Sequence, residues 1–393
     1  MNRLLMLSAL FCSVSVVFGA ASDGHAFFGD PPDDAHPWAV HDQNRPLPKV
    51  VTPGTFSSAE QPGKPPADAI VLFDGTEASL ANWEPDDKAK GKPWILKDGA
   101  LECVPKSGYT KSKKEFGDVQ LHVEWAAPKK VEGNGQGRGN SGIFLPGNLE
   151  VQVLDNYNNP TYADGTAGAL YGINPPMVNP LNPPGEFQVV DIVFRRPLFK
   201  DGKCTEPGHV TVFINGVLVQ DSTPPEGSGG FMGRSKARPY PEKGPLKLQD
   251  HGNPVRFRNI WYRELPTRIV EDGSNGHLSP EATMAKRKEI AAGIREDAAK
   301  LKDANNPLPE LLRLAESLIY EKEDATFQKV SEMAKQFVDG VKQLPADKLG
   351  SKRGEIMSLN GAFRYLSTKA GVLPADFAPK TDLEKLIKDQ NWK

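Results

Sequence analysis

The sequence contains 393 residues, which is more than one small hydrophobic core requires and fits two domains with connecting segments. Its formal net charge of -2 at neutral pH excludes the strong positive field of a typical nucleic-acid-binding protein. The 37 glycines and 35 prolines imply many turns, and they favour a β-rich protein over a mainly helical one.

The first 21 residues have the three parts of a signal peptide. Arg3 gives the positive start, residues 4–18 form an uncharged apolar run, and small residues follow at positions 19–21. The run is short for a membrane-spanning helix, and no later segment of the sequence is apolar enough to span a bilayer. We therefore expect an exported protein, periplasmic or extracellular, whose mature chain begins near residue 21 or 22.

Two cysteines, Cys103 and Cys204, remain after such a cleavage, in an oxidising compartment where a disulfide can form. Spacing along the chain does not fix the geometry of a bridge. A disulfide and two separate thiols, one of them buried on a strand, therefore both stay open.

Residues 22–67 are rich in proline, aspartate and glycine, and they show neither the period of a strand nor that of a helix. This composition predicts an extended arm or linker. His25, His36 and His41 lie in this arm. They are either solvated side chains or part of a metal site, and their scattered positions favour solvated side chains.

Residues 68–266 change to short alternating runs separated by turn residues, which is the pattern of antiparallel strands. Asp98 followed by Gly99, and Asn215 followed by Gly216, each stand between two apolar runs and predict two-residue hairpin turns. Many strands without a long helical stretch predict one all-β sandwich domain.

From about residue 273 to residue 393 the apolar period becomes helical. Ser279, Pro280 and Glu281 provide a cap, a first-turn proline and an acidic first turn. Several apolar stripes with Lys- and Glu-rich outer faces follow, which predicts a small helical bundle. The bundle shows no catalytic constellation, so a spacer or a protein-binding surface is its expected role.

The run Leu-Glu-Val-Gln-Val-Leu-Asp, which begins at residue 149, is the most suggestive for chemistry. On a strand Val151 and Val153 face the core, so Glu150 and Gln152 face the opposite side, where a curved sheet can form a groove. Asp155 is out of phase and needs a one-residue bulge to join them. Two carboxylates in one groove can act as acid and base. The alternative is an ordinary solvent-facing strand that ends in a turn.

A second polar group lies just before a predicted strand. Gln249, Asp250 and His251 bring an amide, a carboxylate and an imidazole into successive positions. An imidazole beside a carboxylate can be held in one tautomer and titrate near neutral pH. The alternative is a polar turn in which His251 only caps the loop.

Long irregular segments rich in Gly, Pro, Asn and Tyr surround these two groups, and sandwich enzymes and lectins build their sites from such loops. Arg138 ends one of these segments, and Tyr171 lies in another, where its ring could stack on a sugar. The sequence contains no zinc-binding spacing and no phosphate-binding loop. No cofactor is therefore predicted, and a structural or catalytic divalent metal stays open.

Six short motifs occur in order between about residues 68 and 265. They are Phe73-Asp74-Gly75 with Trp83, Asn140-Ser141-Gly142-Ile143, Glu150-Val151-Gln152-Val153-Leu154-Asp155, Gly168-Ala169-Leu170-Tyr171, Asn215-Gly216, and Gly244-Pro245-Leu246-Lys247-Leu248-Gln249-Asp250-His251-Gly252. Together they resemble the 3-keto-disaccharide hydrolase domain family, also described as a 3-keto-glucoside lyase and hydratase family. The resemblance implies a concanavalin A-like jelly-roll sandwich and exported carbohydrate chemistry, and it does not extend to the helical tail.

The resemblance implies an enzyme that acts on oxidised glycosides. A ketone at C3 acidifies the C2 proton, a base removes that proton, the C1 aglycone leaves, and water adds back to give the free keto-sugar. We assign the acid and base work to Glu150, Asp155 and His251 without dividing the roles. The expected substrate-binding residues are Arg138, Asn140, Gln152, Tyr171 and Gln249.

The strand motif also resembles that of laminarinase-like glycosidases of the same fold, which have acidic residues at the positions of Glu150, Gln152 and Asp155. Gln152 departs from that pattern and puts their retaining mechanism in doubt. A conventional glycoside hydrolase and a non-catalytic carbohydrate-binding module remain alternatives. The expected partner is an oligosaccharide or glycoside, with no nucleic acid and no membrane span, and the helices could bind a protein.

Overall fold

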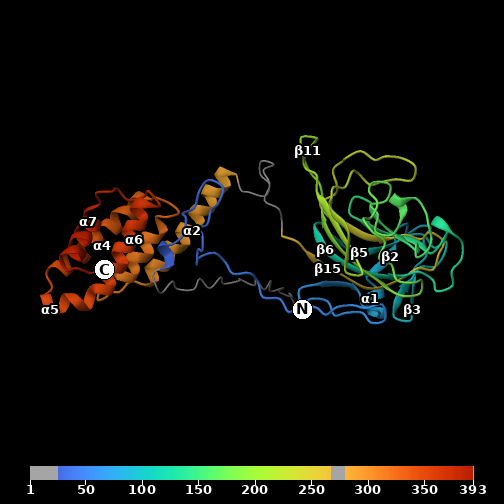
Figure 1. Ribbon diagram of the computed structural model, residues 1–393, viewed down its shortest axis with the longest axis horizontal. Helices are drawn as coiled ribbons and strands as arrows, with labels where there is room; N and C mark the ends of the chain where they lie inside the picture. The colour runs from blue at the N-terminus through green and yellow to red at the C-terminus, as the bar shows by residue number, and fades with distance from the viewer. Residues whose placement is uncertain (1–24, 267–278, 393) are drawn as a thin grey trace, which may run out of the picture. The chain divides into compact units, whose positions relative to one another are not determined.

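The computed structural model of the protein describes residues 25–266 and 279–392. These residues form two compact units, one built of strands and one of helices (Figure 1). Residues 50–266 belong to the β unit, and residues 25–49 belong with the helices. No helix within the described ranges is long and apolar enough to cross a membrane. The predicted signal peptide falls outside the described residues.

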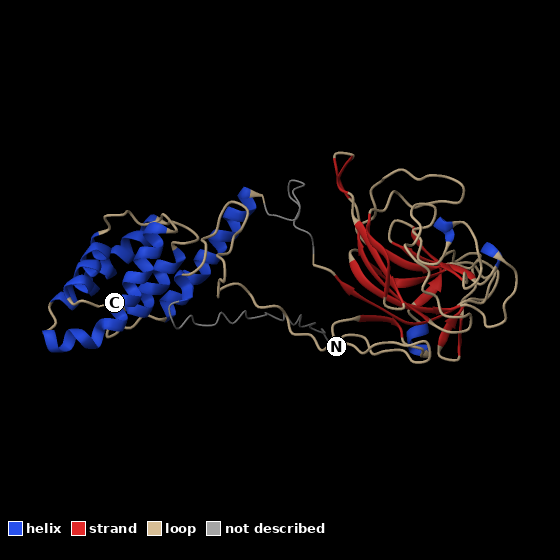
Figure 2. Ribbon diagram, in the orientation of Figure 1, coloured by secondary structure: helices blue, strands red, loops and turns tan. Residues whose placement is uncertain are grey.

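Two antiparallel sheets form the β unit (Figure 2). The larger sheet contains, in spatial order, β13 (Val217–Thr223), β12 (His209–Ile214), β9 (Gln188–Arg195), β6 (Val119–Ala126), β15 (Arg256–Glu264), β4 (Ala100–Glu102) and β3 (Ile95–Lys97), with β1 (Ile70–Phe73) also paired to β15. The smaller sheet contains β2 (Trp83–Pro85), β5 (Thr110–Phe116), β14 (Gly244–Leu248), β7 (Asn140–Leu145) and β8 (Leu149–Leu154). The remaining elements of this unit are the hairpin β10 (Leu198–Lys200) and β11 (Lys203–Glu206), the short helix α1 (Glu77–Leu80), and the 3-10 turns η2 (Gly135–Gly137) and η3 (Ala163–Gly165).

The two sheets enclose one hydrophobic core, as the alternating pattern predicts. Side chains that are at most 1% exposed come from both sheets and include Leu121, Val123, Ile192, Val151 and Val153. Burial of an aliphatic side chain of this size contributes about 1.5–3 kcal/mol, so the core fixes which face of each strand turns away from it. The predicted β-sandwich with a helical tail is confirmed.

Both predicted two-residue hairpin turns are present. Asn215 and Gly216 connect β12 to β13 with φ angles of 52° and 77°. Asp98 and Gly99 connect β3 to β4 with φ angles of 50° and 73°. Positive φ at both central residues is the turn geometry that matches the twist of paired strands. Local sequence therefore sets the register of these two hairpins.

Residues 50–67, predicted to belong to an extended arm or linker, form a strap against the larger sheet. The strap folds back on itself, with the N–H of Thr55 donating to the Lys64 carbonyl at 2.9 Å. Arg258 of β15 donates to backbone carbonyl oxygens of the strap, at 2.8 Å for Ser58. Backbone acceptors are the same in every sequence, which is why composition alone did not indicate this contact.

A buried polar cluster joins the strap to the sheet. Glu124 of β6 is fully buried and accepts a hydrogen bond from Nε of Arg258 at 2.7 Å. His122 lies between Glu124 and Asp191, at 3.2 and 2.7 Å, and its ring stacks on Trp261. Burial opposes protonation of His122, but its hydrogen bonds to the two carboxylates outweigh burial and raise its pKa to about 9. Two cations and two carboxylates therefore balance in this cluster.

The helical unit contains α2 (Pro280–Lys300), α3 (Leu308–Ser317), α4 (Asp324–Lys342), α5 (Ala346–Leu349), η4 (Gly350–Lys352), α6 (Arg353–Thr368) and α7 (Ala378–Asp389). Helix α2 begins at the predicted cap, because the Ser279 hydroxyl accepts a hydrogen bond from the N–H of Ala282 at 3.2 Å. Gly371 follows α6 with a φ of 65°, the left-handed conformation that commonly ends a helix.

The first part of the predicted arm, residues 25–49, packs against these helices. It starts with η1 (His25–Phe27), and Trp38 contacts the helical core. Asn44 is buried and donates to Glu316 of α3 at 2.6 Å. The stretch predicted as one extended arm or linker is therefore divided, in its described part, between the two units of the chain.

The two cysteines do not form a disulfide. Cys103 is buried and Cys204 is exposed, and both are free thiols. This settles the question that the sequence left open, with the buried cysteine next to the end of β4.

We predict that the strap stabilises the β unit. A fragment of residues 50–268 should melt at a higher temperature than one of residues 68–268, because the Arg258 guanidinium loses its strap acceptors in the shorter fragment. The lost hydrogen bonds correspond to about 1–3 kcal/mol. Calorimetry of both fragments checks this, and identical melting would contradict the role of the strap.

The polar cluster should make stability depend on pH. Because folding raises the pKa of His122 from 6.5 to about 9, its contribution is fully present below pH 6.5 and is lost as pH rises towards 9. The stability advantage of the wild type over His122→Gln should therefore shrink between those pH values. Urea unfolding at several pH values measures it, and NMR titration of the imidazole provides an independent check.

Candidate active site

Strands β7 and β8 position the polar residues that the sequence singles out. They pair without a register shift, so Glu150 lies opposite Phe144 and Gln152 lies opposite Gly142. Val151 lies between the two polar residues in sequence and is buried in the core. Glu150 and Gln152 therefore point to the other face of the smaller sheet, which we call the site face.

The Glu150 carboxyl group is buried without a charged partner. The residue is 8% exposed, and no described residue donates a hydrogen bond to its carboxyl group. Gly142 makes room for it, since a Cβ atom there would lie 2.3 Å from Oε1 of Glu150. Burial raises the pKa of Glu150 to about 7, because the carboxylate loses hydration that no nearby cation replaces. A carboxyl group that titrates near neutral pH can serve as acid or base.

Three amide side chains lie at one end of the site face. Gln152 donates to Oε1 of Gln136 at 3.1 Å and to the carbonyl of Gly165 at 3.2 Å. Asn140 donates to the carbonyl of Gln136 at 2.9 Å. The loops that carry η2 and η3 therefore cover the ends of β7 and β8. The side-chain oxygens of Asn140 and Gln152 have no donor among the described residues, which leaves two buried acceptors suited to hydroxyl groups.

Asp155 does not join Glu150. The β7–β8 ladder keeps its register up to Leu154, so the predicted bulge is wrong. The chain turns after the strand instead, and the N–H of Asp155 donates to the Gly139 carbonyl at 2.8 Å. Its carboxylate is 3% exposed and is bound by Arg138, with Nε at 2.8 Å and Nη2 at 2.6 Å. This ion pair neutralises Asp155 and fixes the loop before β7.

Gln249 reaches the site face from the end of β14. Its N–H donates to the Gly142 carbonyl at 3.1 Å, and its side chain donates to the Tyr109 hydroxyl at 2.8 Å. The Tyr109 ring packs on Phe144. Burial raises the pKa of Tyr109 despite the Gln249 hydrogen bond, and the charge of Glu150 adds to the rise. The phenol therefore keeps its proton at neutral pH, and its O–H group donates no hydrogen bond to any described residue.

His251 has no contact with this arrangement. It is exposed in the turn after β14, and its ring has no hydrogen bond or ion pair with any described residue. Asp250 instead fixes the turn, because its carboxylate accepts from the N–H groups of Gly108 at 2.9 Å and Gly252 at 2.8 Å. The thiol of Cys103 also lies 3.5 Å from it. The Asp250 carboxylate therefore accepts hydrogen bonds from backbone N–H groups and makes none with the His251 ring.

Tyr171 lies beside Glu150 through the backbone. Its N–H donates to the Glu150 carbonyl at 3.1 Å, and its hydroxyl is 2.8 Å from that of Tyr162. Burial raises the pKa of Tyr171, and the Tyr162 hydrogen bond and the Glu150 charge add to the effect. Tyr162 is 44% exposed, so this pair brings an accessible aromatic ring close to the site.

Tyr109, Gln136 and Phe144 belong to the site but were not predicted from the sequence. Tyr109 directly precedes β5, and the Gly108 before it gave the only local signal, that of a turn. Gln136 lies in the Gly-rich loop from which the sequence analysis chose only Arg138. Across residues 25–266 and 279–392, no group of three or more His, Cys, Asp or Glu side chains is placed to hold a metal ion.

The fold, the matching family and a similar solved structure together place the chain among β-sandwich carbohydrate-active proteins. Residues 68–263 match the family described as the 3-keto-alpha-glucoside-1,2-lyase-like domain. The chain belongs to this family, as the motifs in its sequence indicated. No protein with a curated description matches the sequence.

One solved structure supports this assignment. A candidate glycosyl hydrolase from Parabacteroides distasonis ATCC 8503 is 43% identical, with a TM-score of 0.51, and the match covers 56% of this chain and 93% of that one. A second candidate glycosyl hydrolase from the same organism is 20% identical, with a TM-score of 0.36 and coverage of 51% and 94%. The alginate lyase Aly36B is 10% identical, with a TM-score of 0.31 and coverage of 50% and 97%. Only the first likeness is strong enough to support an inference.

We predict that Glu150→Gln stabilises the β unit at high pH. Because burial raises the Glu150 pKa from 4.5 to about 7, ionisation destabilises the folded wild type increasingly from pH 4.5 to 7. The stability gain of the variant should be near zero at pH 4 and reach roughly 3 kcal/mol above pH 7. Urea unfolding of both proteins at several pH values measures this gain. A gain that does not change with pH would show that Glu150 is not perturbed.

Proposed function

We propose that the protein cleaves 3-keto-glycosides by elimination followed by hydration, and that it does so after export. The observation that carries this proposal is Glu150, a buried carboxyl group without a charged partner whose pKa is about 7. Such a group can remove a carbon-bound proton at neutral pH and return it later in the cycle. The family assignment supports a 3-keto-glucoside as the substrate.

In the first step the Glu150 carboxylate removes the proton from C2 of the sugar. The electron pair of that C–H bond forms the C2 enolate of the C3 ketone. The enolate then re-forms the ketone while the C1–O bond breaks, and the aglycone departs with a proton. Addition of water across the resulting double bond gives the free 3-keto-sugar, so the net reaction is hydrolysis without an external oxidant.

Tyr109 is the best-placed donor for the oxygen that becomes negative in this reaction. Its phenol keeps its proton because burial raises its pKa, and Gln249 already donates to its oxygen at 2.8 Å. The hydrogen of the phenol therefore remains available to the enolate or to the leaving oxygen. Gln152 and Asn140 have buried acceptor oxygens that suit the sugar hydroxyls.

A conventional retaining glycosidase requires a second free carboxylate close to the first. Asp155 is not available for that work, because Arg138 binds its carboxylate at 2.6 Å. Gln152, the residue on the same face as Glu150, is a neutral amide. These contacts favour proton abstraction by a single carboxyl group over double displacement by two.

Assay of a 3-keto-glucoside and of the parent glucoside tests the proposal. The wild type should cleave only the oxidised sugar. Glu150→Gln should lower kcat/KM by about 10²–10⁴-fold, and Tyr109→Phe by about 10²-fold, because each removes a proton-transferring group or a donor. Glu264→Gln, at an exposed position, is the matched control and should retain full activity.

Two outcomes would contradict the proposal. Equal cleavage of the parent glucoside would identify a conventional hydrolase. Binding of both sugars without cleavage of either would identify a carbohydrate-binding module.

His251→Ala should retain activity, because no contact links this exposed side chain to the site.

A further inference from the structure

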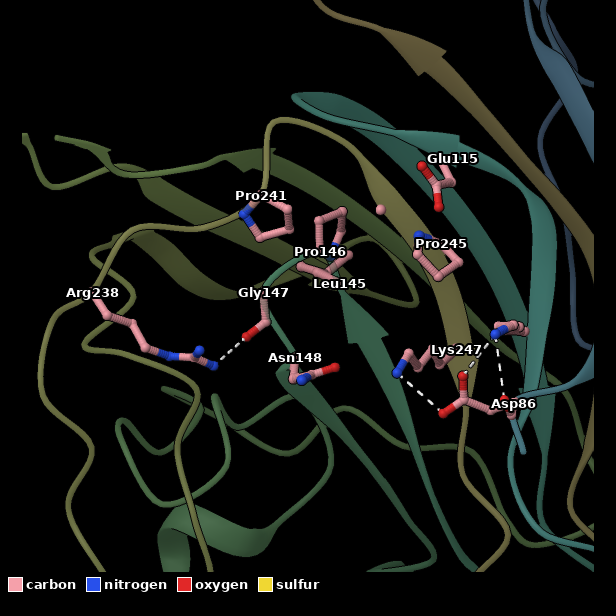
Figure 3. Close-up of a pocket in the computed structure, with 12 residues that line it drawn as sticks. Asp86, Glu115, Leu145, Pro146, Gly147, Asn148, Arg238, Pro241, Pro245 and Lys247 are labelled. Atoms are coloured by element: carbon pink, nitrogen blue, oxygen red, sulfur yellow. Dashed lines mark hydrogen bonds and ion pairs between the residues drawn. The ribbon is translucent and has the colours of Figure 1, made fainter. Parts of the chain in front are cut away.

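A pocket of about 320 Å³ opens on the smaller sheet next to the candidate site (Figure 3). Its floor and walls come from β5, β14 and the turn between β7 and β8. The charged residues that line it are Asp86, Lys111, Glu115, Arg238 and Lys247. Lys247 belongs to the last of the six sequence motifs, but no step of the proposed reaction uses any of these charges.

The pocket opens on the same face of the sheet as Glu150, which does not itself line it. Asn148, which lines the pocket, is two residues before Glu150 in the chain. Phe144 lies opposite both Glu150 on β8 and Lys247 on β14, so all three side chains share the site face. Two strand spacings separate Lys247 from Glu150, a distance of roughly 10 Å, which one sugar ring and its substituent can span.

The pocket has an excess of positive charge. Three cations, Lys111, Arg238 and Lys247, line it with two carboxylates, Asp86 and Glu115, which leaves an excess of one positive charge. Asp86 pairs with both lysines, with Lys247 at 3.1 Å and Lys111 at 3.3 Å. Figure 3 shows the ammonium group of Lys247 directed at the Asp86 carboxylate, and Arg238 directed at the backbone of Gly147. Lys247 has three N–H donors and Asp86 is its one acceptor among the described residues, so two donors remain for a ligand.

We propose that this pocket is the subsite for the leaving group, and that it selects leaving groups that carry a carboxylate. The inference rests on the proposed function only in naming the ligand as a leaving group. Lys111 and Lys247 are each only 24% exposed at the side chain, so a bound anion faces ammonium groups that water screens weakly. A neutral leaving group would make hydrogen bonds there but would not balance the charge.

Binding of two matched leaving-group mimics tests this inference without any turnover. We expect 4-hydroxybenzoate to bind the full-length protein about tenfold more tightly than neutral 4-hydroxybenzamide at low ionic strength, as a charge-assisted hydrogen bond predicts. Lys247→Met keeps the apolar stem and removes the charge, so the ratio of the two dissociation constants should fall from about ten to about one. Lys111→Met is a second variant should the first not fold.

Lys243→Met is the matched control, because Lys243 is an exposed lysine, 56% exposed at the side chain, that does not line the pocket. It should retain the tenfold preference. Equal binding of the two mimics by the wild type would overturn the inference, as would a preference that survives both lysine substitutions. A protein that cleaves no 3-keto-glucoside but shows Lys247-dependent binding would keep the anion subsite and lose the proposed reaction.

Discussion

The side-chain alternation of β8 determines where the chemistry of this protein is placed. Val151 and Val153 are buried in the sandwich core, and that burial commits Glu150 and Gln152 to the opposite face. Loops then cover that face, so Glu150 loses water without gaining a cation. Its pKa of about 7 follows from this burial, and the same constraint gives the molecule a carboxyl group that titrates near neutral pH.

The other charged groups near this carboxyl group differ in whether their charges are balanced. Asp155 is paired with Arg138, and this ion pair supports a loop. The pocket beyond Phe144 instead carries an excess of cations. The smaller sheet thus presents an amide cluster, a buried carboxyl group without a charged partner, and a pocket with excess positive charge. This arrangement suits the proposed sugar ring with a charged leaving group.

The sequence predicted those features that depend only on interactions between residues close together in the chain. The Asn215 turn and the Ser279 cap are examples, because each depends on a few adjacent residues. The sequence did not reveal that His251 lacks a carboxylate partner, because the Asp250 carboxylate accepts a hydrogen bond from a backbone N–H group instead of the His251 ring. Tyr109 was missed because a long-range sheet pairing brings it to Gln249, and the strap was missed because Arg258 binds carbonyl oxygens that every sequence has.

The central claim is that Glu150 removes a proton from C2 of an oxidised sugar, and isotopic substitution at that carbon tests it most directly. We expect a 3-keto-glucoside carrying deuterium at C2 to react more slowly than the protium substrate, with a primary kinetic isotope effect on kcat/KM. Deuterium at C4 should leave the rate unchanged. Equal rates for the C2-deuterated and unlabelled substrates, together with no solvent exchange at C2, would contradict the account.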